Sequence, residues 1–306
     1  MSKKAIIDVG SNSIKFFLGD LAQDGTLKTV IDENDIARLG EGLRETGEIN
    51  PEAMRRNSEA IARFAEKARA NGVSEILCVG TMALRNAKNT ADFIKLVKET
   101  SNVNLTVIPG EEEARLAYIA VLSGLTLHDG KLAIFDTGGG STEFIFGEGS
   151  SVSKRFSVDL GAIRITEKHF KADPVSKEDV DAAIAEIEDI FKGNGVDGKV
   201  AQLVGMGGTV TSMGAVKHKM AKYDPDVIQG STLTLADVEE QIEVYSSRTI
   251  EARKEITGLQ PKRADVILAG ACILKVIINR LGVNALTISD RGLRHGMAFD
   301  MLQKNK

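Results

Sequence analysis

The chain has 306 residues, a formal net charge of −4, 42% hydrophobic residues and 27% charged residues. This composition is typical of an ordinary soluble globular protein with one large or two medium domains. The negative net charge gives no support for non-specific binding of nucleic acid, so a polyanionic substrate would need local cations or a metal ion.

The first predicted elements belong to a repeat. Residues 6–20 read IIDVGSNSIKFFLGD and residues 134–148 read IFDTGGGSTEFIFGE, and a constant offset aligns them without gaps, with Asp8 on Asp136 and Ser13 on Ser141. Each copy predicts a β-hairpin whose turn presents backbone N–H groups. The spacing between the two copies is too long for a solenoid repeat and indicates a duplicated domain, with one hairpin turn from each half facing a cleft between the halves.

Helices and strands alternate in the remainder of each half. Asn50 and Pro51 are typical of a helix start, and apolar runs that end in Gly predict strands. Helices are expected over residues 51–70, 90–100, 111–122, 177–192, 235–246, 264–281 and 293–303, and strands over residues 75–80, 105–108, 202–205 and 285–289. This alternation indicates an α/β protein with mixed sheets, with domains at residues 1–124 and 125–306 and the last helix packed back on the first domain.

The glycine-rich turn of the second copy is the sharpest local signal. The turn includes Gly138, Gly139, Gly140, Ser141 and Thr142. Three consecutive glycines let the backbone approach a ligand closely and turn several N–H groups toward phosphate oxygens. The flanking acids, Asp136 and Glu143, could hold Mg²⁺ on the same phosphate. The alternative is a plain hairpin turn with two solvated acids.

The turn of the first copy replaces these glycines with Ser11, Asn12 and Ser13, whose side chains can donate hydrogen bonds to phosphate. Taken alone, it could equally be a surface turn. A third glycine turn, Gly207-Gly208-Thr209, follows a predicted strand. It could bind another phosphate or a nucleoside edge, or it could serve close strand–helix packing.

Three acids, Glu111, Glu112 and Glu113, begin the helix at residues 111–122. Acids in a first turn stabilise a helix through its dipole, or one of them could orient a water for attack on phosphorus. The spacing of the three glutamates does not show which of them would orient the water. Arg85, just beyond a strand, could hold a phosphate oxygen or remain solvated, and Arg291 and Arg294 could add positive charge or simply begin a helix.

Several motifs stand in the order seen in the exopolyphosphatase/guanosine pentaphosphate phosphatase family, which the whole chain resembles. They are DVGSNS, the TMALRNAKN stretch, GEEEAR, DTGGGSTE, SVDLGAIRIT, VGMGGT and SDRGLRHG. The resemblance implies the actin-like fold of two domains with an interdomain cleft. It also implies Mg²⁺-assisted removal of a terminal phosphate from inorganic polyphosphate or from guanosine pentaphosphate.

The family motifs also suggest roles for individual residues. The resemblance assigns Glu113 as the general base and Arg85 as the catalytic arginine. It places Asp136, Glu143 and Asp8 among the acids associated with metal and phosphate. The remaining matches form the phosphate-binding set: Gly138, Gly139, Gly140, Ser141, Thr142, Ser11, Asn12, Ser13, Gly207, Gly208 and Thr209.

The main expectation is a cytoplasmic exopolyphosphatase that is a homodimer, without a signal peptide, a nucleic-acid partner or a membrane partner. The alternatives are a guanosine pentaphosphate 5′-phosphohydrolase, a non-enzymatic sensor of guanosine tetraphosphate or polyphosphate, and an ATP-dependent kinase of the same fold. Cys78 and Cys272 lie in apolar runs and are expected to be core thiols. A long polyanion would need a basic track, for which the candidates are Lys15, Arg38, Arg85, Arg164, Arg263, Arg291 and Arg294. No role follows from the sequence for His295.

Overall fold

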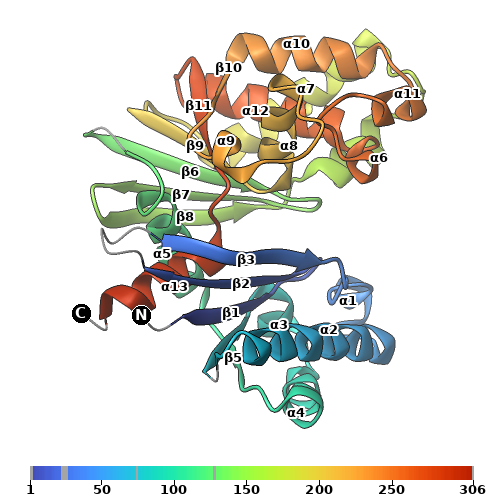
Figure 1. Ribbon diagram of the computed structural model, residues 1–306. Coiled ribbons are helices and arrows are strands. Elements are labelled where there is room, and N and C mark those ends of the chain that lie inside the picture. Colours follow the sequence, from blue (N-terminus) through green and yellow to red (C-terminus); the bar gives the residue numbers. More distant parts are fainter. Residues whose placement is uncertain (1–2, 22–26, 74, 127–128, 305–306) are drawn as a thin grey trace. The chain divides into compact units, whose positions relative to one another are not determined.

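The computed structural model describes residues 3–21, 27–73, 75–126 and 129–304 (Figure 1). The chain forms two compact units. Unit 1 consists of Met1–Ser123 and Leu293–Lys306, and unit 2 consists of Gly124–Gly292. Each unit contains one mixed β-sheet and the helices that cover it, as the alternation of elements in the sequence predicts.

Unit 1 is built on a five-stranded sheet with the order β3-β2-β1-β4-β5. The strands are β1 (Lys4–Val9), β2 (Ile14–Leu21), β3 (Leu27–Asp35), β4 (Ile76–Gly80) and β5 (Leu105–Val107). β2 is antiparallel to both β1 and β3, whereas β4 is parallel to β1 and to β5. Every residue of β1 is buried, because this apolar strand is central and both faces of the sheet are covered.

Within the described residues of unit 1, six helices accompany this sheet. They are α1 (Leu43–Thr46), α2 (Pro51–Ala70), α3 (Met82–Asn86), α4 (Thr90–Ser101), α5 (Gly110–Leu122) and α13 (Leu293–Lys304). One face of the sheet packs Ile7 against α2 and α4, and the opposite face packs Ile6 and Phe17 against α5 and α13. The last helix therefore completes unit 1, although 169 residues of unit 2 separate it from the rest in sequence.

Unit 2 is built on a six-stranded sheet with the order β10-β11-β9-β6-β7-β8. The strands are β6 (Lys131–Thr137), β7 (Thr142–Glu148), β8 (Ser151–Val158), β9 (Gln202–Met206), β10 (Thr232–Thr234) and β11 (Ala285–Ser289). The series β8-β7-β6-β9-β11 repeats β3-β2-β1-β4-β5 with the same strand directions. The duplication predicted from the repeated hairpin is therefore present in the topology, with β10 added at one edge.

The helices of unit 2, labelled in Figure 1, contribute to one large apolar cluster. They are α6 (Ala162–His169), α7 (Lys177–Gly193), α8 (Gly208–Lys217), α9 (Pro225–Ile228), α10 (Leu235–Ser246), α11 (Ile250–Lys254) and α12 (Ile267–Arg280), with a 3₁₀ turn at Pro261–Arg263. The helix α12 is buried on most of its surface. The prediction that this helix begins at residue 264 is wrong by about one turn. A 3₁₀ turn and a tight turn come first, and α12 starts at Ile267.

Both cysteines are buried free thiols, as predicted. Among the described residues, no helix combines the length and apolar character that crossing a bilayer requires.

Candidate functional site

The glycine turn of unit 2 joins β6 to β7 and is closed by the N–H of Gly138, which donates to the carbonyl of Ser141 at 2.9 Å. The start of α6 fixes the other carbonyls of the turn. The N–H groups of Ala162 and Ile163 donate to the carbonyls of Gly138 and Gly139 at 3.0 and 2.9 Å. Because these two carbonyls accept hydrogen bonds from the start of α6, the turn can present its own N–H groups on the opposite side.

In the part of the chain that the structure describes, the N–H groups of Gly139, Gly140 and Ser141 have no protein acceptor. The turn is held against α6 by a backbone contact, since a Cβ at Gly161 would overlap the carbonyl group of Gly139. Successive free N–H groups in a fixed turn form an anion-binding nest. A plain hairpin turn would not require the close backbone contact between Gly161 and Gly139.

The turn of unit 1 is held in the same way. The N–H of Gly10 donates to the carbonyl of Ser13 at 3.1 Å. Arg38 and Gly40 donate to the carbonyls of Asn12 and Ser11 at 2.9 and 2.8 Å. Arg38 adopts φ 47°, a left-handed conformation that is uncommon for a residue with a side chain.

A Leu-Gly pair supports each turn. Leu39 and Leu160 are fully buried, and the following Gly40 and Gly161 lie against the two turns. This second repeated feature was not found by sequence reasoning. The signal was available, because each pair follows the third strand of its unit, but the spacing from the hairpin differs between the copies.

Asp136 and Glu143 lie directly opposite each other in the antiparallel pair of β6 and β7. Oε1 of Glu143 accepts hydrogen bonds from the hydroxyls of Ser141 at 2.6 Å and Ser157 at 3.1 Å. Burial, and then the negative charge of Asp136, raise the pKa of Glu143 above its ordinary value. Two facing carboxylates supply the oxygen ligands that a hard divalent cation prefers.

The third glycine turn lies beside Asp136. Gly207 has φ 84° and leaves no room for a side chain, because a Cβ there would overlap the carboxylate of Asp136. A Cβ at Gly208 would overlap the guanidinium of Arg263. Close packing therefore accounts for these glycines.

Arg263 is also near Asp136. Burial lowers the pKa of Arg263 and the charge of Asp136 opposes this shift, so the arginine faces the acid. Thr209 uses its hydroxyl to bind the carbonyl of Thr137 at 3.2 Å. Whether this turn also binds phosphate stays a prediction.

In unit 1 the structure distinguishes the acids at the start of α5. The guanidinium of Arg115 donates hydrogen bonds of 2.8 and 2.7 Å to the carboxylate of Glu112, and it also donates to Asp300 of α13. Glu113 instead forms an ion pair with Arg85, whose Nη2 lies 2.8 Å from its Oε2. The side chains of this pair are 28% and 33% exposed, so solvent reaches both. Glu112 thus serves helix packing, and Glu113 is the acid that stands beside the predicted arginine.

Asp8, the next-to-last residue of β1, lies opposite Lys15 and is buried, with 4% of its surface exposed. Burial raises its pKa, and the charges of Lys15 and Arg294 oppose that rise. Arg294 is itself held by Asp32, with Nε–Oδ1 and Nη2–Oδ2 distances of 2.7 and 2.9 Å.

The two remaining residues of the final motif have different surroundings. Buried His295 places Nε2 3.0 Å from Oδ2 of Asp32 and contacts the edge of Phe17. Arg291 packs against Gly124, and burial lowers its pKa while the charge of Asp226 opposes this. Of the candidate basic track, Lys15, Arg38, Arg85 and Arg294 belong to unit 1, and Arg164, Arg263 and Arg291 belong to unit 2.

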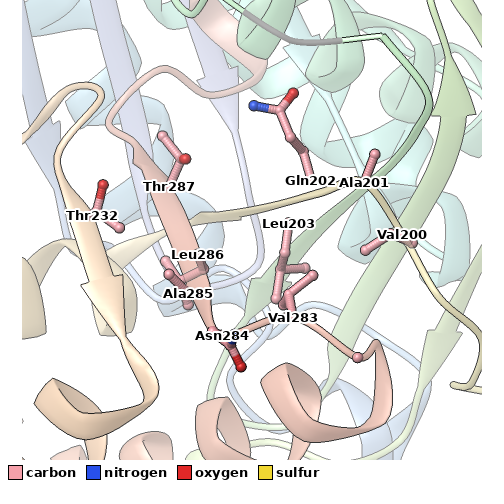
Figure 2. A pocket seen from close by; sticks show the side chains of 11 residues that line it. Val200, Ala201, Gln202, Leu203, Thr232, Val283, Asn284, Ala285, Leu286 and Thr287 are labelled. Atoms are coloured by element: carbon pink, nitrogen blue, oxygen red, sulfur yellow. The ribbon is translucent and has the colours of Figure 1, made fainter.

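The pocket in Figure 2 lies elsewhere in unit 2. It has a volume of about 410 Å³ and is lined by residues at the beginnings of β9 and β11, with Thr232, Asn284 and Thr287 among them. The glycine turn at Gly207 follows the opposite end of β9. Among the residues that the structure describes, no ionisable side chain lines this pocket, so these residues lack the carboxylates that flank the turn at residues 138–141.

Within the described ranges, no group of three or more His, Cys, Asp or Glu residues could by itself hold a metal ion. The facing pair Asp136 and Glu143 could supply part of such a site, with substrate oxygens and water completing it.

Comparisons with known proteins agree with this architecture. The model of the Ppx/GppA phosphatase family matches residues 21–305. A Mycobacterium tuberculosis protein named exopolyphosphatase 2 is 30% identical over 316 residues, which are 98% of this chain and 99% of the relative. A guanosine-5′-triphosphate,3′-diphosphate pyrophosphatase of Photobacterium profundum is 32% identical over 304 residues, 98% of this chain and 59% of the relative.

A bifunctional 3-dehydroquinate synthase/phosphatase of Fusobacterium nucleatum is 30% identical, and the chain spans only 45% of its length. Among solved structures, the Ppx/GppA family member of Aquifex aeolicus superposes with a TM-score of 0.90 at 30% identity, covering 100% of this chain and 99% of that one. The actin-like fold that the motifs imply is confirmed. The chain therefore belongs to the Ppx/GppA phosphatase family.

Proposed function

We propose that the chain is an exopolyphosphatase, which hydrolyses the terminal phosphate of inorganic polyphosphate. The observation that carries this proposal is the turn at residues 138–141, whose free N–H groups stand beside two facing carboxylates. Such a nest binds phosphate oxygens without a Walker motif. The relative named exopolyphosphatase 2 matches along its whole length, which favours polyphosphate over other phosphoanhydrides.

In the proposed reaction, a water molecule attacks the terminal phosphorus in line with the anhydride oxygen. Glu113 accepts the proton of this water. The anhydride P–O bond breaks, its electrons stay on the leaving oxygen, and the products are inorganic phosphate and a chain shorter by one phosphate. The N–H groups of Gly139, Gly140 and Ser141 stabilise the charge on the phosphoryl oxygens.

Arg85 has two tasks in this proposal. It pairs with Glu113 in the present structure, and an incoming phosphoryl group would compete for its guanidinium. The competition would release Glu113 to act as a base.

We further propose that Asp136 and Glu143, with Asp8, provide the protein ligands for Mg²⁺. The bound ion would neutralise phosphoryl oxygens. The oxygen-only character of this donor set fits Mg²⁺ better than zinc. The pair Asp136 and Glu143 fits better than Asp8, because Asp8 is almost fully buried, whereas Asp136 and Glu143 are partly exposed.

The second candidate is a guanosine pentaphosphate 5′-phosphohydrolase. It is favoured by the Photobacterium profundum relative, which aligns with 98% of this chain. The same loop and the same base would serve it, since both substrates end in a phosphoanhydride. For either substrate we propose a cytoplasmic homodimer that needs no nucleic-acid or membrane partner.

Phosphate release from long-chain polyphosphate, guanosine pentaphosphate and ATP, each with Mg²⁺ and with EDTA, tests this proposal. We expect release from polyphosphate that EDTA abolishes. Release from the nucleotide alone would transfer the assignment to the second candidate. A folded protein that binds these compounds and releases phosphate from none of them would be a sensor, and consumption of ATP only with an acceptor would indicate a kinase.

A further inference from the structure

Ser157 lies on β8, outside the turn that is expected to hold phosphate. In the antiparallel pair of β7 and β8 it stands directly opposite Glu143. Glu143 in turn stands directly opposite Asp136 on β6. The three residues therefore form a row across three neighbouring strands, and cross-strand partners present their side chains on the same face of a sheet.

The two hydroxyls near Glu143 bind the same oxygen atom. Ser141 donates to Oε1 at 2.6 Å and Ser157 donates to Oε1 at 3.1 Å. Two donors on one oxygen fix the orientation of the carboxylate plane and leave Oε2 outside both bonds. A carboxylate that is held in this way can present its second oxygen to a cation without losing entropy at the moment of binding.

The two serines differ in what substrate binding would do to them. Ser141 belongs to the turn itself, so its hydroxyl can rotate toward a bound phosphoryl group. Ser157 is fixed by the backbone pairing of β7 with β8 and does not belong to the turn. It is therefore the donor that can keep Oε1 in place whether or not phosphate is bound.

We propose that Ser157 is a positioning residue of the phosphatase site, which orients Glu143 for the divalent cation that Glu143 and Asp136 hold. This inference rests on the proposed function for the identity of the site, but its test does not require turnover. Ser157 is exposed, so its hydroxyl contributes little to packing and can be removed without creating a cavity.

The same strand offers a matched control. Ser153 is also exposed on β8, four residues earlier, and its hydroxyl donates to the backbone carbonyl of Phe146 at 3.2 Å and not to a carboxylate. Ser157→Ala and Ser153→Ala therefore remove the same group from the same strand. Ser157→Thr keeps a hydroxyl on the strand and serves as the rescue variant.

The experiment measures Mn²⁺ binding to the full chain by electron paramagnetic resonance, with no substrate present. We expect Ser157→Ala to weaken Mn²⁺ binding about 10-fold, Ser157→Thr to restore it to within about threefold, and Ser153→Ala to leave it unchanged. In the polyphosphate assay, the Mg²⁺ concentration for half-maximal rate should rise by the same factor as the Mn²⁺ Kd, while KM for polyphosphate stays constant.

Equal Mn²⁺ binding by wild type and Ser157→Ala would overturn the inference, and so would absence of binding by both. A wild type that binds Mn²⁺ but cleaves none of the phosphate compounds would refute the proposed function alone, and the comparison of Ser157→Ala with Ser153→Ala would still decide the role of Ser157.

Discussion

The residues around Glu143 and Glu113 suit these two carboxylates to different chemical roles. Glu143 lies opposite Asp136, so two negative charges lie close together, and two serine hydroxyls donate hydrogen bonds to its carboxylate. Glu113 stands beside Arg85 in a partly exposed position. The surroundings of Glu143 suit the binding of a cation. Those of Glu113 suit a carboxylate that loses its ion pair when a bound anion pairs with Arg85 instead.

The backbone contact between Gly161 and Gly139 gives a prediction for a single residue. A Cβ in Gly161→Ala would overlap the carbonyl of Gly139, so the turn must shift. We expect a loss of about 1–3 kcal/mol in the free energy of unfolding, as for other overpacked sites, together with a lower kcat on polyphosphate. Urea denaturation and steady-state kinetics measure both quantities.

Gly193→Ala is the control, because nothing lies within 4 Å of a Cβ at this last residue of α7. It should leave activity unchanged and stability equal or slightly higher. If Gly161→Ala behaved like the control, the turn would not depend on this contact.

The candidate site could be predicted only in part from residues. The repeated Asp, Gly and Ser positions identify both turns, because their chemistry is local. Glu113 could not be separated from Glu111 and Glu112 by spacing, since the choice depends on Arg115 and Asp300, and Asp300 is distant in sequence. Ser157 and Gly161 lie in the SVDLGAIRIT motif, but the motif did not reveal their individual contacts, which depend on strand register and on a backbone contact.

At the level of elements, the third strand of each sheet was not predicted. β3 and β8 are edge strands whose side chains are mostly exposed, so neither contains the long apolar run that indicates a buried strand. α6 was missed for a related reason, because it is short and buries few side chains. The elements that were predicted are those with apolar cores or clear caps, such as α2, in which Asn50 accepts the N–H of Ala53 at 2.7 Å.

The attachment of α13 to β3 predicts a pH dependence of stability. Burial opposes ionisation of Asp32, but hydrogen bonds and charges from His295 and Arg294 outweigh it and hold its pKa below the ordinary 3.8. A carboxyl whose pKa is lowered in the folded state contributes stability above its unfolded pKa and loses that contribution as the pH falls through its folded pKa.

We therefore expect Asp32→Asn to cost about 1–2 kcal/mol at about pH 7, reduced by the partial exposure of the site. This difference should shrink as the pH falls below about 4. Urea denaturation over this range measures it. Glu33→Gln on the same strand, whose partner Lys67 is well exposed, should have a smaller effect, and a pH-independent cost for Asp32→Asn would contradict the assigned ion pairs.

At the scale of the whole molecule, the duplication is the feature that sequence could predict best. A repeated hairpin of 15 residues was sufficient, because the hairpin begins each unit and the strand order after it is the same in both. The return of the last helix to unit 1 was also expected. Substrate choice was not, since polyphosphate and guanosine pentaphosphate present the same terminal group.

Phosphate release from polyphosphate by Glu113→Gln, compared with wild type and with Glu111→Gln, tests the central claim most directly. Glu111 begins the same helix as Glu113 and is exposed. If Glu113 is the general base, its variant should lose about 10²-fold or more in kcat while Glu111→Gln keeps the wild-type rate. A Glu113→Gln protein that releases phosphate as fast as wild type would show that hydrolysis does not use this residue.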